Sequence, residues 1–139
     1  KMDKLSQLGF IASELLLERE GNKRFVEREN RAIILFNQSG SVDADRKYLE
    51  SIAPENYYPS PSLFVYTLPN IVTGEIAIRN KYFGETSFYI LPQKDEHIMK
   101  KIVCASISES TESVIAGWVD YASPCNFLSE LYLLKVDNK

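Results

Sequence analysis

The stretch from Pro61 to Gln93 constrains the fold most, because it carries the signals for two regular elements and the turn between them. Three prolines bias the beginning of this stretch away from a helix: Pro59, Pro61 and Pro69. Each proline restricts the backbone angles of its own residue and of the residue before it. Gly84 predicts a turn, because glycine reaches positive φ without a Cβ clash. The short apolar segment Ser87–Leu91 then predicts a buried strand.

A helix is predicted between the proline-rich beginning and Gly84. Asn70 is a suitable N-cap, since its side-chain oxygen can accept a hydrogen bond from a free backbone N–H group. Apolar or small residues follow at helical spacing and define the expected inner face. These residues are Ile71, Gly74, Ile78 and either Ile76 or Ala77.

Three further strands are predicted outside this stretch. Ala32–Phe36 is a continuous run of apolar residues, and its length and branched side chains favour a buried parallel strand. Val114–Tyr121 and Phe127–Val136 flank a short turn at Ser123–Asn126, which predicts a β-hairpin.

Three more helices complete the predicted order. The first covers Met2 to about Arg19, the second begins at Ser41 or Asp43 and continues to Ile52, and the third covers Lys94 to about Ser108. The charged segment Glu18–Arg31 is interpreted as a solvated connection. The alternation of helices and strands predicts an α/β fold built in layers.

Length and composition limit the classes of function. The chain has 139 residues, which suits one domain, and its net charge of −3 argues against a nucleic-acid or anionic-membrane surface. No apolar run approaches the roughly 20 residues that span a bilayer. We find no spacing typical of a metal site and no glycine-rich phosphate motif, so we expect no cofactor, although the loop Asn37–Ser41 could hold an anion or only form a turn. With no signal peptide, the two cysteines are expected to be reduced thiols in a cytoplasmic protein.

Several short motifs occur in a definite order along the chain. They are Lys1-Met2-Asp3 followed by Leu8-Gly9, Pro61-Ser62, Asn70 to Gly74, Gly84-Glu85-Thr86 and Ala116-Gly117. This order resembles the N-terminal half of a β-ketoacyl synthase, and the resemblance is closest to small ketosynthase-like or chain-length-factor-like proteins of aryl polyene or pigment synthesis. It implies half of a thiolase-like fold, layered α/β/α around a mixed sheet, with residues 1–139 as a single half-domain.

The resemblance also implies where catalytic residues would stand. A ketosynthase carries a cysteine nucleophile at a strand-to-helix elbow, where the helix N-terminus lowers the pKa of the thiol. Counting from Gly84 puts Gln93 at this position, and counting back from Ala116-Gly117 puts Pro92 there. Neither is a nucleophile, and the histidines of the second half of the family are absent from the sequence. Asn70, Gly74 and Gly84 remain as structural motif positions.

We assign no catalytic role to the histidine or to either cysteine. We expect His97 on the surface and Cys104 in the core, while Cys125 falls in the turn of the hairpin. Four aromatic residues could line an acyl groove, although such residues more commonly belong to a core. They are Tyr57, Tyr58, Phe64 and Tyr66.

We therefore hypothesise a non-condensing, ketosynthase-like protein of fatty-acid or polyketide synthesis that acts as the partner or chain-length-type subunit of a complete ketosynthase. One alternative is a 3-oxoacyl-carrier-protein synthase or acyltransferase with a composite site. Another is a module that binds an acyl group or an acyl carrier protein. On the first hypothesis, we expect the chain alone to be catalytically inactive.

The resemblance makes two predictions about architecture. A strand upstream of the Lys-Met-Asp motif, or some other segment, should lie between Ala32–Phe36 and Val114–Tyr121, so that these two do not pair directly. Ser87–Leu91 should lie at the edge of the sheet and form a homo- or heterodimer there, because an exposed apolar edge offers unpaired backbone groups to another chain.

Overall fold

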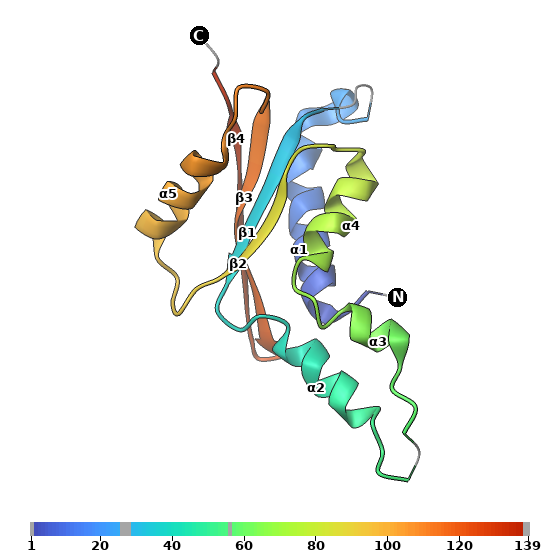
Figure 1. Ribbon diagram of the computed structural model, residues 1–139. Coiled ribbons are helices and arrows are strands. Elements are labelled where there is room, and N and C mark those ends of the chain that lie inside the picture. Colours follow the sequence, from blue (N-terminus) through green and yellow to red (C-terminus); the bar gives the residue numbers. More distant parts are fainter. Residues whose placement is uncertain (1, 26–28, 56, 138–139) are drawn as a thin grey trace.

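The computed structural model describes residues 2–25, 29–55 and 57–137, so Lys1 of the first motif lies outside the described residues. A four-stranded sheet runs through the centre of the molecule, between two layers of helices (Figure 1). The elements are α1 (Lys4–Leu17), the 3-10 segment η1 (Glu18–Lys23), β1 (Arg31–Asn37), α2 (Val42–Glu50), α3 (Pro61–Val65), α4 (Ile71–Asn80), β2 (Thr86–Ile90), α5 (Glu96–Ser106), β3 (Ser113–Ser123) and β4 (Asn126–Lys135).

The sheet has the order β2-β1-β3-β4. β1 is parallel to both β2 and β3, and every one of its seven residues is buried. β3 and β4 form an antiparallel hairpin whose closing pair is Ser123 and Asn126. These findings confirm the mixed sheet, the buried parallel strand and the hairpin.

Side chains on the two faces of β1 alternate, and each set packs under a different helical layer. Ile33 and Leu35 join the cluster beneath α1 and α4, which includes Leu17 and Val72. Ile34 and Phe36 join a second cluster with Met99 and Val103 of α5. Helices therefore cover both faces, which confirms the α/β/α layering (Figure 1).

The prediction of a segment between β1 and the strand at Val114–Tyr121 is wrong. β1 and β3 are direct neighbours, paired from Arg31 with Ser113 to Phe36 with Trp118. The two strands satisfy one another's backbone hydrogen-bonding groups, so no gap is left for another strand. This detail departs from the arrangement that the family resemblance implies, although the layers and the mixed sheet agree with it.

The residues around Pro61 form a short helix where an extended segment was predicted. Pro61 is the first helical residue, a position at which its missing N–H group is harmless. The Ser60 side chain caps this helix by accepting a hydrogen bond from the Leu63 N–H group at 3.3 Å. Proline at 61 therefore begins a helix rather than preventing one.

The inner face of α4 differs from the predicted one. Val72, Thr73, Ile76 and Asn80 are buried, whereas Ile78 is 80% exposed. The polar side chains can be buried because they bond to the backbone: Thr73 to the Asn70 carbonyl at 2.6 Å and Asn80 to the Ile76 carbonyl at 2.8 Å. The spacing of hydrophobic residues alone therefore predicted the wrong side of α4 to be buried.

Two predicted motif positions serve other purposes than expected. Asn70 stands at the N-cap of α4, but its side chain makes no capping hydrogen bond. The left-handed residue that ends α4 is Lys81, with φ of 59°, and not Gly84. Gly84 is needed for close packing, because a Cβ there would lie 2.4 Å from the Arg31 carbonyl oxygen.

Candidate functional site

The elbow between β2 and α5 is the position at which the family resemblance places the nucleophile. Pro92 and Gln93 both lie in this elbow and are exposed. Asp95 caps α5 by accepting hydrogen bonds from the N–H groups of His97 and Ile98, each at 3.1 Å. A carboxylate of the chain therefore already occupies the helix N-terminus, where a thiolate would otherwise be stabilised.

The other reactive side chains lie apart from one another. His97 is exposed on the first turn of α5, as predicted. Cys104 is exposed and not in the core, because α5 turns Met99 and Val103 toward the sheet. Cys125 is exposed in the turn between β3 and β4. Among the described residues, no group of three or more His, Cys, Asp or Glu side chains is arranged to hold a metal ion.

The loop Asn37–Ser41 follows the carboxyl end of β1 and forms a closed turn. The Asn37 side chain donates to the Gly40 carbonyl at 2.8 Å and accepts from its N–H group at 2.9 Å. Asp120 accepts from the Ser39 N–H group at 3.1 Å and from its hydroxyl group at 3.3 Å. Asp120 thus occupies the place of an anion, which favours the structural interpretation of this loop.

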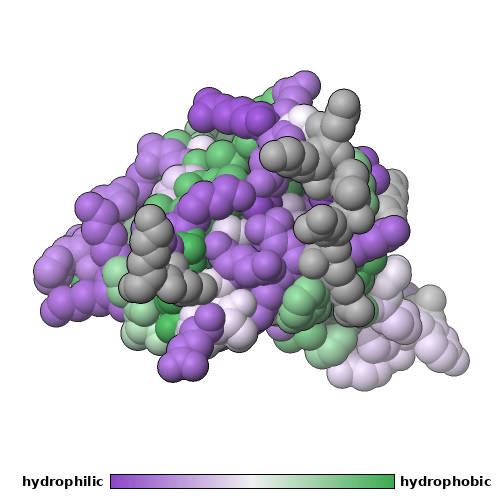
Figure 2. Space-filling model, turned by 90° about the horizontal axis from the view of Figure 1, so that it is seen from above, coloured by the Kyte–Doolittle hydropathy of each residue, from purple (hydrophilic) through white to green (hydrophobic). Residues whose placement is uncertain are grey.

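Arg31 forms the largest buried ionic cluster that the structure describes, at the beginning of β1. Its guanidinium donates to both carboxylate oxygens of Glu20, at 2.5 and 2.8 Å, and to Glu29 at 3.0 Å. Tyr82 and Ser113 contact the same guanidinium at 2.9 and 2.6 Å. Figure 2 views this end of the molecule, where hydrophilic residues gather with hydrophobic areas between them.

The contacts within this cluster shift the pKa values of Glu20 and Arg31. Hydrogen bonds from Arg31 lower the pKa of Glu20 to about 2, against the opposing effect of burial, and Lys135 at 3.1 Å assists them. Burial disfavours the charge of Arg31, but its hydrogen bonds to Glu20 and the electrostatic attraction of the neighbouring acidic groups together outweigh this effect, so the pKa of Arg31 is raised. Glu18–Arg31 is therefore more than a solvated connection, although its residues 26–28 lie outside the described part.

β2 forms one edge of the sheet, as predicted for Ser87–Leu91. The Glu85 carbonyl accepts from the Ile33 N–H group at 2.8 Å, and the Leu91 N–H group donates to Asn37 at 2.7 Å, both toward β1. Because backbone groups alternate in direction along a strand, the N–H groups of Thr86, Phe88 and Ile90 face the free edge.

A groove runs along this free edge. Its volume is about 460 Å³, and its walls are the residues of β2 together with Pro69 and Asn70 from the loop before α4. Ile90 is 58% exposed at one end of the strand. The edge therefore offers both backbone hydrogen-bonding groups and apolar surface to another chain.

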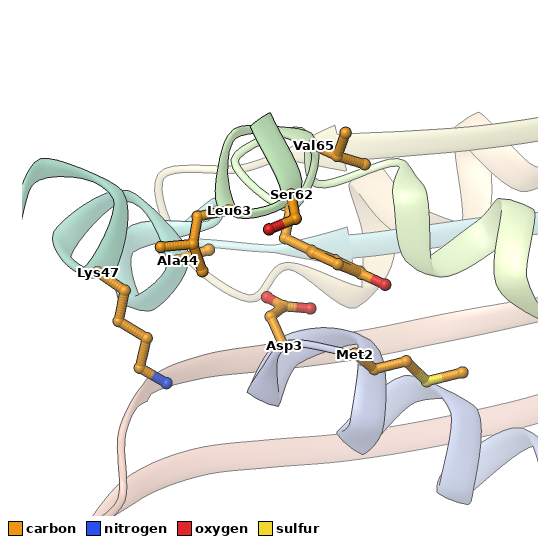
Figure 3. A pocket seen from close by; sticks show the side chains of 8 residues that line it. Met2, Asp3, Ala44, Lys47, Ser62, Leu63 and Val65 are labelled. Carbon is orange, nitrogen blue, oxygen red and sulfur yellow. The ribbon is translucent and has the colours of Figure 1, made fainter. Parts of the chain in front are cut away.

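The four aromatic residues do not share one environment. Tyr57 and Tyr58 are 74% and 82% exposed, so they belong to neither a groove nor a core. Phe64 is half-exposed and packs against Tyr48, with ring centroids 5.4 Å apart. Tyr66 lines a cavity of about 500 Å³, together with residues from α2, from α3 and from the segment just before α1 (Figure 3).

Comparison with solved structures identifies the fold. A chain of the ketosynthase (ApeO) in complex with its chain length factor (ApeC) from Xenorhabdus doucetiae matches with a TM-score of 0.75 and 16% sequence identity. The match covers 96% of this chain and 58% of that one. The ishigamide ketosynthase/chain length factor matches with a TM-score of 0.71 and 18% identity, over 97% of this chain and 44% of that one.

The present chain thus spans about half the length of the chains that it resembles. It has the fold of part of a ketosynthase, which is thiolase-like, and this confirms the resemblance at the level of structure. No family model and no curated protein matches its sequence. No described helix has the length and apolar character that a membrane crossing requires.

Proposed function

We propose that this chain is a non-condensing, ketosynthase-like subunit that works beside a complete ketosynthase in fatty-acid or polyketide synthesis, of the aryl polyene type. The fold supports this role, because chains of similar structure occur in complexes of a ketosynthase with a chain length factor. The chain would adjust or support the partner that carries the catalytic cysteine.

The observation that carries the non-condensing part of the proposal is the elbow after β2. Condensation requires a thiolate that attacks an acyl thioester, held at a helix N-terminus. Pro92 and Gln93 have no nucleophilic side chain, and Asp95 binds two of the free N–H groups in the first turn of α5. A negatively charged intermediate at this elbow would be repelled by that carboxylate.

Partner binding is assigned to the free edge of β2. Its outward N–H groups and the groove beside Pro69 and Asn70 suit the addition of a strand from another chain. A homodimer through the same edge is the other form of this proposal. Acyl carrier protein would then meet the complex at the catalytic partner.

Intact-protein mass spectrometry tests the absence of condensing activity. The chain is incubated with an acyl carrier protein that bears an acyl thioester, and a complete ketosynthase serves as the positive control. We expect an acyl adduct on the control enzyme only. A second sample treated with iodoacetamide shows that Cys104 and Cys125 are accessible, since both are exposed. An acyl adduct on either cysteine would contradict the proposal and favour the enzymatic alternative.

A further inference from the structure

The outer side of α1 carries apolar residues where a surface helix normally carries polar ones. Ile11 and Leu15 are 57% and 64% exposed. The opposite side of α1, which faces the core, buries the small polar residues Ser6 and Ser13 beside its leucines. A surface helix of a single domain typically has one apolar face and one polar face. α1 therefore has a second apolar face, which the described part of this chain leaves uncovered.

The residues on this outer side follow the spacing of helices that pack in pairs. Lys4, Leu8, Ile11, Leu15 and Glu18 are separated by four and three positions in alternation, and we call these five residues the α1 stripe. This spacing keeps them along one side of a helix and is the spacing of coiled-coil contacts. The three apolar residues lie in the middle of the stripe, where Leu8 is partly buried because it also packs against the core.

The two ends of the α1 stripe have opposite charges. Lys4 is the first residue of α1 and Glu18 is its C-cap, and both are exposed. The helix dipole favours an acidic side chain at the beginning of a helix and a basic one at its end, so each charge stands at the end that favours it less. Residues that contradict a local preference in this way are candidates for a contact with another molecule.

We propose that the α1 stripe binds α1 of a second copy of this chain, with the two helices antiparallel and the two-fold axis at Ile11. Ile11 lies seven positions from Lys4 and seven from Glu18, so each Lys4 meets the Glu18 of the other copy. Leu8 of one copy then packs beside Leu15 of the other. A parallel pair would place like charges side by side at both ends, which disfavours it.

This contact is separate from the edge strand β2. α1 belongs to a helical layer on one face of the sheet, whereas β2 forms an edge of the sheet, so the inference does not depend on the proposed function. A contact one helix wide belongs to the class of small, weak interfaces. We therefore expect self-association at protein concentrations of about 0.1 mM and above.

Sedimentation equilibrium of the full chain, over a range that extends above this concentration, measures the dissociation constant. Ile11→Lys places two like charges at the two-fold axis and should weaken the dimer about tenfold or more. Ile98→Lys is the matched control, because Ile98 is an exposed isoleucine of α5, on the other face of the sheet, and should leave the dimer unchanged. Circular dichroism shows that both variants are folded.

Charge exchange tests the antiparallel arrangement. Lys4→Glu and Glu18→Lys should each weaken the dimer about threefold or more, because two exposed ion pairs become two like-charge contacts. The double variant restores opposite charges and should associate like the wild-type chain. Each single change suits the dipole of α1, so a weaker dimer would not reflect a weaker helix.

Three results would overturn the inference. The first is a wild-type chain that stays monomeric over the whole concentration range. The second is equal association of Ile11→Lys and the wild-type chain, or equal weakening by Ile11→Lys and Ile98→Lys. The third is a double charge variant that associates as weakly as the single ones.

Discussion

Gly84 and Gly74 stand in opposite surroundings at the scale of single residues. A Cβ at Gly84 would lie 2.4 Å from the Arg31 carbonyl oxygen and 2.8 Å from Asn30, whereas a Cβ at Gly74 would meet nothing within 4 Å. The first glycine lets the chain approach β1 closely, and the second is an ordinary helical position with unused space.

The two alanine variants should therefore change stability in opposite directions. We expect Gly84→Ala to lower the free energy of unfolding by at least about 1–3 kcal/mol, the typical cost of overpacking. The added Cβ would meet the backbone of Arg31, which would have to move. Gly74→Ala should be neutral or raise it by about 0.5–1 kcal/mol through better helix propensity. Urea unfolding measures both. Equal effects of the two variants would show that the close contact at Gly84 is not decisive.

Glu20 makes stability depend on pH. Its pKa is about 2 in the folded chain, compared with an ordinary value of 4.5. The folded state therefore binds this proton less readily than the unfolded state. The contribution of Glu20, about 3 kcal/mol at most, is fully present above pH 4.5 and decreases as the pH falls toward 2.

Unfolding of the wild-type chain and of Glu20→Gln at a series of pH values checks this expectation. The difference in free energy of unfolding between the two should shrink steadily between pH 4.5 and 2. Glu75→Gln is the control, because Glu75 has no partner in the cluster around Arg31. A difference that stays constant over this range would contradict the assigned pKa.

At the scale of elements, strands were easier to predict than helix faces. A continuous apolar run marks β1, and a short polar turn between two runs marks the β3–β4 hairpin, so both signals are local. Helix faces depend on buried polar residues such as Thr73 and Asn80, whose hydrogen bonds to nearby carbonyl groups leave no trace in hydrophobic spacing. The helix that begins at Pro61 was not predicted, because proline is unfavourable inside a helix but favourable at its first position.

The edge strand β2 supplies the prediction at this scale. Ile90→Pro removes an N–H group that faces the free edge and leaves the bonds to β1 intact, whereas Ile90→Ala removes a similar part of the side chain and keeps the N–H group. We expect the proline variant to weaken association through β2 clearly more than the alanine variant does. Sedimentation velocity measures the association, and circular dichroism shows that both variants are folded.

Similar weakening by proline and alanine would assign the interface to the Ile90 side chain rather than to strand pairing. A wild-type chain that stays monomeric at high concentration would exclude the homodimer. The heterodimer with a ketosynthase would then be the form left to test.

At the scale of the whole molecule, the layered α/β/α fold could be predicted from the order of motifs, but the ionic cluster could not. Arg31 joins groups from η1, the segment after α4 and the beginning of β3, and Lys135 reaches Glu20 across 115 positions of sequence. Partners so distant are brought together only by the finished fold. The elbow was predictable in position, because it follows a strand, whereas its capping by Asp95 required the structure.

The central claim is that the chain works as a non-condensing partner of a complete ketosynthase. Co-expression of the tagged chain with a complete ketosynthase from the same organism, followed by native mass spectrometry of the purified material, tests this most directly. We predict a heterodimer that Ile90→Pro weakens and that contains one acylated cysteine, on the ketosynthase. A well-folded chain that never associates with the ketosynthase, or one that is itself acylated, would contradict the account.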